Sequence, residues 1–188
     1  MQNSVSAQSD PAILTTAQAA VEHGANANFI SLGFGITALI ATAAVAGFFY
    51  AYSSSVMFGL NVVAPDVALK AMQGINAEVR NPVFALSFFG SAVMLIAATT
   101  IMFMQGNTAS ALWFSAAAIT YIAGGFVLTM AINVPMNEAL ALIDVSSLPD
   151  PAKIWVEYEN PWTFWNHVRT GFSLIAVAMA GLGLWALR

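Results

Sequence analysis

Long apolar runs dominate the chain, and short polar or charged segments separate them. The apolar runs cover about residues 29–57, 82–104, 109–132 and 166–187, and none of them carries a charge in its middle. Each run can cross the hydrocarbon core of a bilayer, which takes about 20 helical residues. Because lipid cannot hydrogen-bond to the backbone, such runs span the membrane as helices. We therefore predict an all-α, polytopic membrane protein built as a four-transmembrane-helix bundle.

The connections between these runs differ in length. A tight turn at residues 105–107 joins the second and third runs and makes them antiparallel neighbours. The first long connection, residues 65–80, predicts a short amphipathic helix between spans one and two, with Val67, Met72 and Ile75 as its apolar stripe. With four spans, both long connections lie on the same side of the membrane.

The second long connection, residues 138–160, is acidic. Pro149 and Pro151 are expected to break any continuous helix there, because proline lacks a backbone N–H.

Residues 1–28 form a polar N-terminal tail before the four-helix domain of residues 29–188. The tail holds no Lys or Arg, and we therefore do not expect it to be a signal peptide. Asp10 and Pro11 are expected to start a short helix as N-cap and first helical residue, and Gly24 to end it.

Small residues indicate where helices pack closely. One ridge repeats every four residues in the first span, and a glycine pair lies in the third. These positions are Ala43, Gly47, Ala51 and Ser55, and Gly124 and Gly125.

Composition supports the membrane assignment and excludes several functions. Hydrophobic residues make up 59% of the chain and charged residues 7%, with a mean hydropathy of +0.76, whereas soluble domains carry about 25% charged residues. A net charge of −4 with five Lys and Arg argues against nucleic-acid binding. The chain has no cysteine and no Glu-x-x-His pair of the kind that holds metals in helix bundles. We expect the lipid bilayer as a partner and no metal site.

Basic residues give an orientation. Lys70, Arg80, Lys153 and Arg169 lie on the side of the long connections, and Arg188 lies on the other. The excess of Lys and Arg in cytoplasmic segments then places the long connections in the cytoplasm. We expect an integral protein of the bacterial inner membrane.

Polar residues gather where the spans meet the long connections. They lie in residues 76–82, 133–138 and 162–169. Spacings of three or four residues place three groups on single helix faces, namely Asn76 with Arg80, Asn133 with Asn137, and Trp162 with Asn166 and Arg169. Since all three segments lie at one membrane face, we expect them to meet.

A charge near the interior of a bundle normally has a partner, and Glu78 or Glu138 is the expected partner of Arg80 or Arg169. We predict a polar pocket lined by Asn133, Asn137, Asn166 and Arg169. The alternative is that each residue has a local role. Tryptophans would then be membrane-interface residues, arginines would reach the headgroups, and asparagines would join helices.

Three sequence motifs resemble a known family. The strings INAEVRNPVF, NVPMN and WTFWNHVRT, in this order relative to the spans, are similar to those of the anthrone-oxygenase-like family of small four-helix membrane proteins. The resemblance covers roughly residues 38–186. It implies an oxygenase that converts an apolar aromatic anthrone to an anthraquinone with molecular oxygen, without a metal, flavin or other cofactor.

The reaction that the resemblance implies would need particular groups, and several residues of this chain are candidates for them. The reaction needs a base, for which His167 and Glu138 are candidates. It needs donors that stabilise an anion, a role open to Arg169, Asn166 and Asn137. Trp162, Trp165 and Tyr121 could stack on a flat substrate. The other substrate-binding candidates are Asn76, Arg80 and Asn133.

Two other functions stay open. One is a non-enzymatic membrane subunit or small-molecule-binding protein. The other is a haem or quinone redox protein with His167 as an axial haem ligand, which a visible absorption band would reveal. Homo-oligomerisation also stays open.

Overall fold

The structure, a computed structural model, describes residues 11–187, and all regular structure in this range is helical. The sequence predicts that Asp10 caps a helix and that Arg188 is the basic residue on the side away from the long connections. Both residues lie outside the described range. The elements in chain order are α1 (Pro11–Ala51), η1 (Tyr52–Val56), α2 (Met57–Leu60), α3 (Pro65–Glu78), α4 (Pro82–Met104), α5 (Thr108–Thr120), η2 (Tyr121–Val127), η3 (Thr129–Asn133), α6 (Val134–Ala141), η4 (Val145–Ser147) and α7 (Pro151–Trp185). Of these, η1, η2 and η3 are π-helical and η4 is a 3₁₀ turn.

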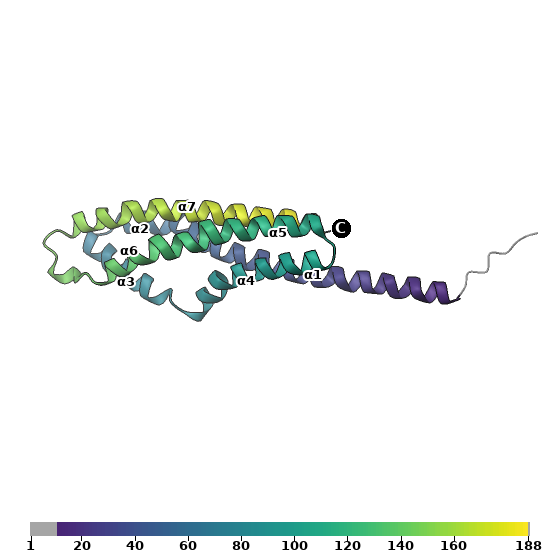
Figure 1. Cartoon of the computed structure of the whole chain (residues 1–188). Helices are drawn as coiled ribbons and strands as arrows, with labels where there is room; N and C mark the ends of the chain where they lie inside the picture. The colour runs from purple at the N-terminus through teal and green to yellow at the C-terminus, as the bar shows by residue number, and fades with distance from the viewer. Residues whose placement is uncertain (1–10, 188) are drawn as a thin grey trace, which may run out of the picture.

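Four long helical segments form an antiparallel bundle (Figure 1). They are α1 continued by η1 and α2, α4 alone, α5 continued through η2 and η3 to α6, and α7. Going round the bundle, α1 packs on α4, α4 on α5, α5 on α7, and α7 on α1. The predicted all-α four-helix bundle is confirmed.

All four segments are long and apolar enough to cross a membrane, and they span Asn28–Leu60, Pro82–Met104, Thr108–Ala141 and Pro151–Trp185. Their outward surfaces are apolar. Large side chains such as Phe29, Val83 and Leu86 are mostly exposed, an arrangement that is stable in lipid and unfavourable in water. The chain is therefore an integral membrane protein.

The helices run beyond the apolar segments at both ends. Helix α1 is continuous from Pro11, so Gly24 does not end it, and its first turns project past the rest of the bundle (Figure 1). Helix α7 starts at Pro151, whose missing N–H costs nothing in a first turn, and the Asp150 carboxylate caps it by accepting from Lys153 N at 3.1 Å. As predicted, no helix runs continuously through residues 138–160, because α6 ends at Ala141 and α7 begins at Pro151; α7 itself contains Pro161.

The turn between α4 and α5 agrees with the sequence. Gly106 has a φ of 77°, in the left-handed region that glycine adopts without steric cost. This single positive-φ residue reverses the chain between the second and third spans.

The predicted amphipathic helix is α3, which packs against α7 and α6. Its buried stripe is Ala68, Leu69, Met72 and Asn76, whereas Val67 is half-exposed. The stripe is therefore shifted from the expected one, because two helices cover α3 instead of a flat membrane surface.

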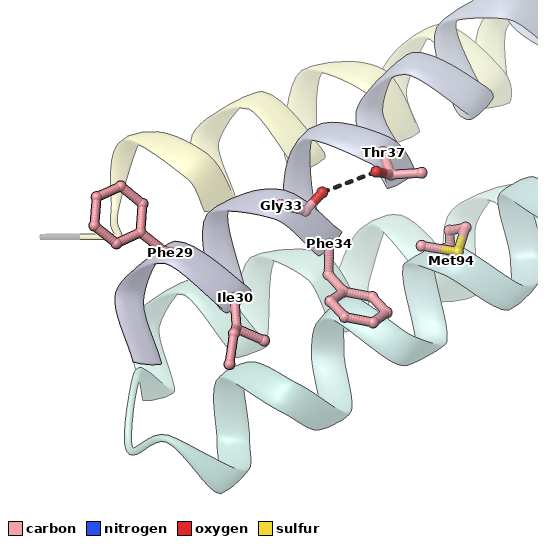
Figure 2. Close-up of a pocket in the computed structure, with 6 residues that line it drawn as sticks. All are labelled: Phe29, Ile30, Gly33, Phe34, Thr37 and Met94. Atoms are coloured by element: carbon pink, nitrogen blue, oxygen red, sulfur yellow. Dashed lines mark hydrogen bonds between the residues drawn. The ribbon is translucent and has the colours of Figure 1, made fainter. Parts of the chain in front are cut away.

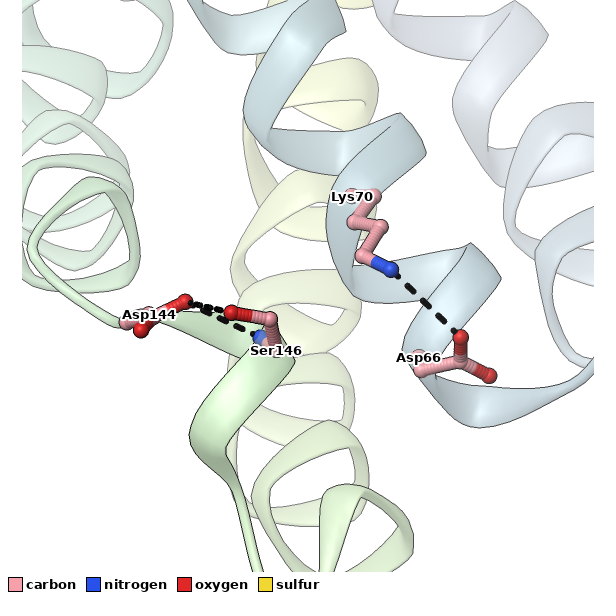
Figure 3. A network of polar contacts seen from close by, with 4 residues as sticks. All are labelled: Asp66, Lys70, Asp144 and Ser146. Atoms are coloured by element: carbon pink, nitrogen blue, oxygen red, sulfur yellow. Dashed lines mark hydrogen bonds and ion pairs between the residues drawn. The ribbon is translucent and has the colours of Figure 1, made fainter.

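Polar contacts order the connections beside α3 (Figure 3). Asp66 and Lys70 form an ion pair at 3.7 Å within the first turns of α3. Asp144 accepts hydrogen bonds from the backbone N–H and the hydroxyl of Ser146 at 3.0 and 2.5 Å. These bonds stabilise the carboxylate and lower the pKa of Asp144.

The two sets of small residues have different roles. Gly47 on the first ridge has no atom near the place of a β-carbon, and Ala43 and Ala51 are exposed, so this ridge faces away from the bundle. At Gly124, by contrast, a β-carbon would lie 2.0 Å from Phe172 Cγ. Close packing through glycine therefore occurs between η2 and α7.

Candidate functional site

Arg169 is the only charged residue among the buried side chains of the described range. It lies on the α7 face that buries Trp162, Asn166 and Ser173, the stripe that the sequence indicated. Its side chain is 4% exposed. Arg169 Nε donates to Asn166 Oδ1 at 3.0 Å, and Nη1 donates to Thr129 Oγ1 at 3.3 Å. Both partners are neutral.

Two aromatic rings flank the guanidinium. Its central carbon lies 4.1 Å from the centroid of Phe49 and 5.0 Å from that of Trp162. Both distances allow a cation–π attraction. No carboxylate in the described part of the chain forms an ion pair with Arg169.

Asn166 ties the centre of α7 to the first span. Its amide nitrogen donates to Phe49 O at 3.0 Å and to Ser53 Oγ at 2.8 Å, while its oxygen holds Arg169. All of its strong hydrogen-bonding groups are thus used. Asn166 orients the guanidinium and has no amide group left for a ligand.

A second group of hydrogen bonds lies nearer to the long connections. Tyr158 and Trp162 of α7 both donate to Asn137 Oδ1, at 2.9 and 2.7 Å, and Asn76 Nδ2 donates to the Tyr158 hydroxyl at 3.2 Å. Since Asn76 comes from α3 and Asn137 from α6, this network holds three elements together.

We expect Asn137→Ala to destabilise the protein. The substitution leaves the Tyr158 hydroxyl and the Trp162 indole N–H without an acceptor, and a buried unpaired donor costs about 1–3 kcal/mol. Thermal unfolding in detergent, followed by tryptophan fluorescence, measures the change. Asn107→Ala is the matched control, because the Asn107 side chain makes no capping hydrogen bond. Equal melting of both variants would contradict this role of Asn137.

A groove of about 590 Å³ opens beside this network, between the end of α3, the start of α4, and η3 with α6. Phe84, Phe88 and Phe89 of α4 form an aromatic wall. Asn76, Asn137 and Thr129 supply polar groups to the same groove. Its volume suits a flat molecule of a few fused rings.

An ion pair stands at the mouth of the groove. Arg80 Nη2 lies 3.5 Å from Glu138 Oε1, and both side chains are 60% exposed. Glu138 is thus the partner of Arg80, one of the pairings that the sequence allowed. The Glu138 carboxylate is therefore accessible to solvent and also lines the groove.

Thr129 connects the groove to Arg169. Its side chain lines the groove, its oxygen accepts from Arg169 Nη1, and its hydroxyl donates to Gly125 O at 2.6 Å. The buried guanidinium therefore lies directly behind one residue of the groove wall.

The structure brings four of the predicted site residues into the groove and places four others behind it. Asn76, Arg80, Asn137 and Glu138 line the groove. Asn133, Trp162, Asn166 and Arg169 are buried in the bundle.

Three candidates lie elsewhere. Tyr121 is fully buried and donates to Phe88 O at 2.7 Å, so it supports the aromatic wall from behind. Trp165 is partly exposed and packs on Phe164. His167 is exposed, and its Nδ1 lies 2.8 Å from Ser53 Oγ between α7 and the first span. None of these three lines the groove.

The aromatic wall and Thr129 were not predicted from the sequence. A signal existed in their spacing, because Phe84 and Phe88 are four residues apart, as are Thr129, Asn133 and Asn137. In a lipid-facing span, however, phenylalanines at helical spacing look the same whether they face a ligand or the bilayer.

The π-helical elements all lie around the polar residues. Ser53 belongs to η1, Tyr121 and Gly125 belong to η2, and Thr129 and Asn133 belong to η3. A π turn bonds each N–H to the carbonyl five residues earlier and is often found at functional sites. Asn133 keeps one further group free, since its buried Oδ1 has no hydrogen-bond partner while Nδ2 donates to Trp162 O at 3.3 Å.

A hollow at the opposite end of the bundle lacks such chemistry (Figure 2). It has a volume of about 310 Å³ and is lined by α1 and α4 through Phe29, Ile30, Phe34 and Met94, with Gly33 and Thr37. Thr37 uses its hydroxyl to donate to Gly33 O at 2.9 Å. Among the described residues no cluster of His, Asp and Glu could hold a metal ion.

The bundle and its groove define a class: a four-helix integral membrane protein with an aromatic and polar cavity at one membrane face. The family model described as anthrone oxygenase matches residues 82–179, which include the second and third spans and most of the fourth. The chain belongs to this family, and the resemblance seen in its motifs is confirmed. Comparison with curated proteins and with solved structures gives no match.

Proposed function

We propose that the protein is an oxygenase that converts an apolar aromatic ketone of the anthrone type to a quinone in the groove. One observation carries this proposal. The groove is lined by an aromatic wall of three phenylalanines together with a carboxylate, a guanidinium and three amides. A flat hydrocarbon frame fits the phenylalanines, and a carbonyl conjugated with an acidic methylene across the same ring fits the polar groups.

The reaction balances with molecular oxygen as the only co-reactant. A base removes a proton from the methylene carbon of the anthrone, and the resulting carbanion gives electrons to dioxygen. A carbon–oxygen bond forms to give a hydroperoxide. Loss of water, through cleavage of the O–O bond and of the second C–H bond, leaves the quinone carbonyl. Because the carbanion supplies the electrons, the proposed reaction needs no cofactor.

Glu138 is the proposed base, since it is the carboxylate that lines the groove. Arg80 lies beside it, with Nη2 3.5 Å from Oε1, and would hold the carboxylate in place at the groove. The Asn137 oxygen is engaged by Tyr158 and Trp162, which leaves its amide N–H₂ to donate to the substrate oxygen. Such donors stabilise the negative charge that moves onto this oxygen after deprotonation.

The position of the groove suits an apolar substrate. The groove lies beside the start of the second span, where the outward residues Val83 and Leu86 are exposed to lipid. A polycyclic ketone dissolved in the bilayer would enter from the side. We propose that this face is cytoplasmic and that the protein resides in the bacterial inner membrane, on the distribution of Lys and Arg.

Oxygen uptake by detergent-purified protein given anthrone tests the proposed function. Ala85 lines the groove, so Ala85→Trp fills it and is expected to lower uptake to the rate of autoxidation. Leu86→Trp is the matched control, because the neighbouring Leu86 is 77% exposed on the lipid side. We expect this variant to keep wild-type uptake and to form anthraquinone.

Other results would change the assignment. Equal slow uptake by all three proteins would remove the oxygenase proposal. If anthrone nevertheless bound to wild-type protein and not to Ala85→Trp, the groove would be a binding site without chemistry. A visible haem band in the purified protein would instead favour a redox protein.

A further inference from the structure

A second groove, which we call the α1–α4 groove, lies where α1, the end of α3 and the first turns of α4 meet. It has a volume of about 610 Å³. Ala44 and Phe48 of α1 line one side of it, and Val83 and Phe84 of α4 line the other. The groove of the proposed function lies instead between α4 and the third span. The two grooves are therefore separate surfaces that share the corner between α3 and α4.

The α1–α4 groove is apolar and opens to lipid. The rings of Phe48 and Phe84 contact each other, with their centroids 4.7 Å apart, and both line the groove. Val83 at its edge is 82% exposed and belongs to the first turn of the second span. Within the spans the groove covers one helical turn, from Val83 to Ser87 on α4, or about 5.4 Å. This length suits the first few carbons of an acyl chain.

Glu78 is the only charged side chain that lines the α1–α4 groove. It is exposed, and it forms no ion pair with another residue of the described range. Arg80, the nearest cation in sequence, lines the other groove and pairs with Glu138. The carboxylate of Glu78 is therefore left at the membrane interface beside an apolar surface.

The other polar side chains of the α1–α4 groove bond to the backbone. Asn81 Nδ2 donates to Glu78 O at 2.6 Å, and Asn81 Oδ1 accepts from Phe84 N at 3.0 Å. Ser87 donates to Phe84 O at 2.9 Å. The negative charge of Glu78 is thus the feature that selects a ligand, and it favours a cation attached to an apolar chain.

We propose that the α1–α4 groove binds phosphatidylethanolamine from the bilayer. Its primary ammonium has three N–H donors and forms a charge-assisted hydrogen bond with the Glu78 carboxylate. The start of one acyl chain lies on Phe48 and Phe84, and the phosphate lies toward the N-terminal end of α4, which favours negative charge. Phosphatidylglycerol has the same phosphate but no cation for Glu78. This site does not depend on the oxygenase proposal.

Lipid titration of the delipidated protein in detergent, followed by native mass spectrometry, tests the site. The probes are phosphatidylethanolamine and phosphatidylglycerol with identical acyl chains. We expect wild-type protein to bind the first lipid about fivefold more tightly, the upper end of what a partly exposed ion pair contributes. Phosphatidylcholine, whose ammonium has no N–H, should bind more weakly than phosphatidylethanolamine.

Two pairs of variants locate the lipid. Glu78→Gln should bind both lipids equally, whereas Glu157→Gln, which removes an exposed acid outside the groove, should keep the preference. Ala44→Trp fills the groove and should lower the binding of phosphatidylethanolamine to that of phosphatidylglycerol. Ala43→Trp is its matched control, because Ala43 is equally exposed on the same helix but does not line the groove.

Three results would overturn the proposal. Equal binding of the two lipids by wild-type protein would show that lipid only surrounds the bundle without a specific site, and this result does not depend on any variant folding. An unchanged preference in Glu78→Gln would remove the carboxylate from recognition. An unchanged preference in Ala44→Trp would place the lipid outside the α1–α4 groove.

Discussion

Glu138→Gln is expected to lower the turnover of anthrone by about 10²- to 10⁴-fold, the usual contribution of a general base. The amide keeps the size of the side chain and its place on the groove wall but cannot accept the proton from the substrate carbon. Stopped-flow or electrode measurements of oxygen uptake at saturating anthrone give kcat, and the apparent affinity for anthrone should change little.

Glu157→Gln is the matched control for this experiment. Glu157 is also an exposed acid of the long-connection end, and it pairs with Lys153 at 3.9 Å. Exposed ion pairs add only about 0–1 kcal/mol to stability, so neither substitution should unfold the protein. Wild-type kcat in Glu138→Gln would show that another group takes the proton and would remove Glu138 from the mechanism.

Gly124→Ala is expected to destabilise the bundle by at least about 1–3 kcal/mol, the usual cost of overpacking a tight contact. A β-carbon at this position would lie 2.0, 2.3 and 2.4 Å from Cγ, Cδ1 and Cβ of Phe172. Because Cβ is fixed to the backbone of α7, the side chain cannot move away, and the helices must separate. Thermal unfolding in detergent measures the loss.

Gly171→Ala is the control for this clash. Gly171 lies next to Phe172 on the same helix, but no atom lies within 4 Å of the place of its β-carbon. Alanine is the better helix former by about 1 kcal/mol, so this variant should be as stable as the wild type or more so. A Gly124→Ala protein that melts like Gly171→Ala would show that η2 and α7 are not in the described contact.

Hydropathy was sufficient to predict the spans and the order of elements. Lipid excludes unpaired backbone groups and charges, so the four apolar runs could only be helices. The turn at Gly106 and the amphipathic α3 followed from local residue types. The ends of the long helices could not be predicted from hydropathy. Charged residues such as Lys153 and Glu157 lie on helical turns that extend beyond the apolar part of α7.

The candidate site could be predicted only in its polar half. Asn166 and Arg169 share a stripe at helical spacing. A charged residue in a span is expected to face the interior of the bundle instead of lipid, so this stripe could be predicted to be buried. The aromatic wall could not be predicted, since Phe84 and Phe88 belong to an apolar span in which most residues face lipid. His167, chemically the more obvious base, lies next to Asn166 in sequence and also contacts Ser53, but it is exposed outside the groove whereas Asn166 is buried, because neighbouring residues of a helix face different directions.

The π turns let the third span lose a residue without turning its polar face. Each π turn accommodates about one residue more than an α-helix needs over the same rise. Deleting one residue between Tyr121 and Val127 would therefore let η2 relax into an ordinary helix, while Thr129 stayed beside Arg169 and Asn137 stayed beside Tyr158 and Trp162. Deleting one residue from α5, which has no extra residue to give up, would instead turn the rest of the span by about 100° and carry both side chains away from these partners. Homologues with a single-residue gap in η2 would therefore keep the groove's polar wall, and those with the same gap in α5 would lose it.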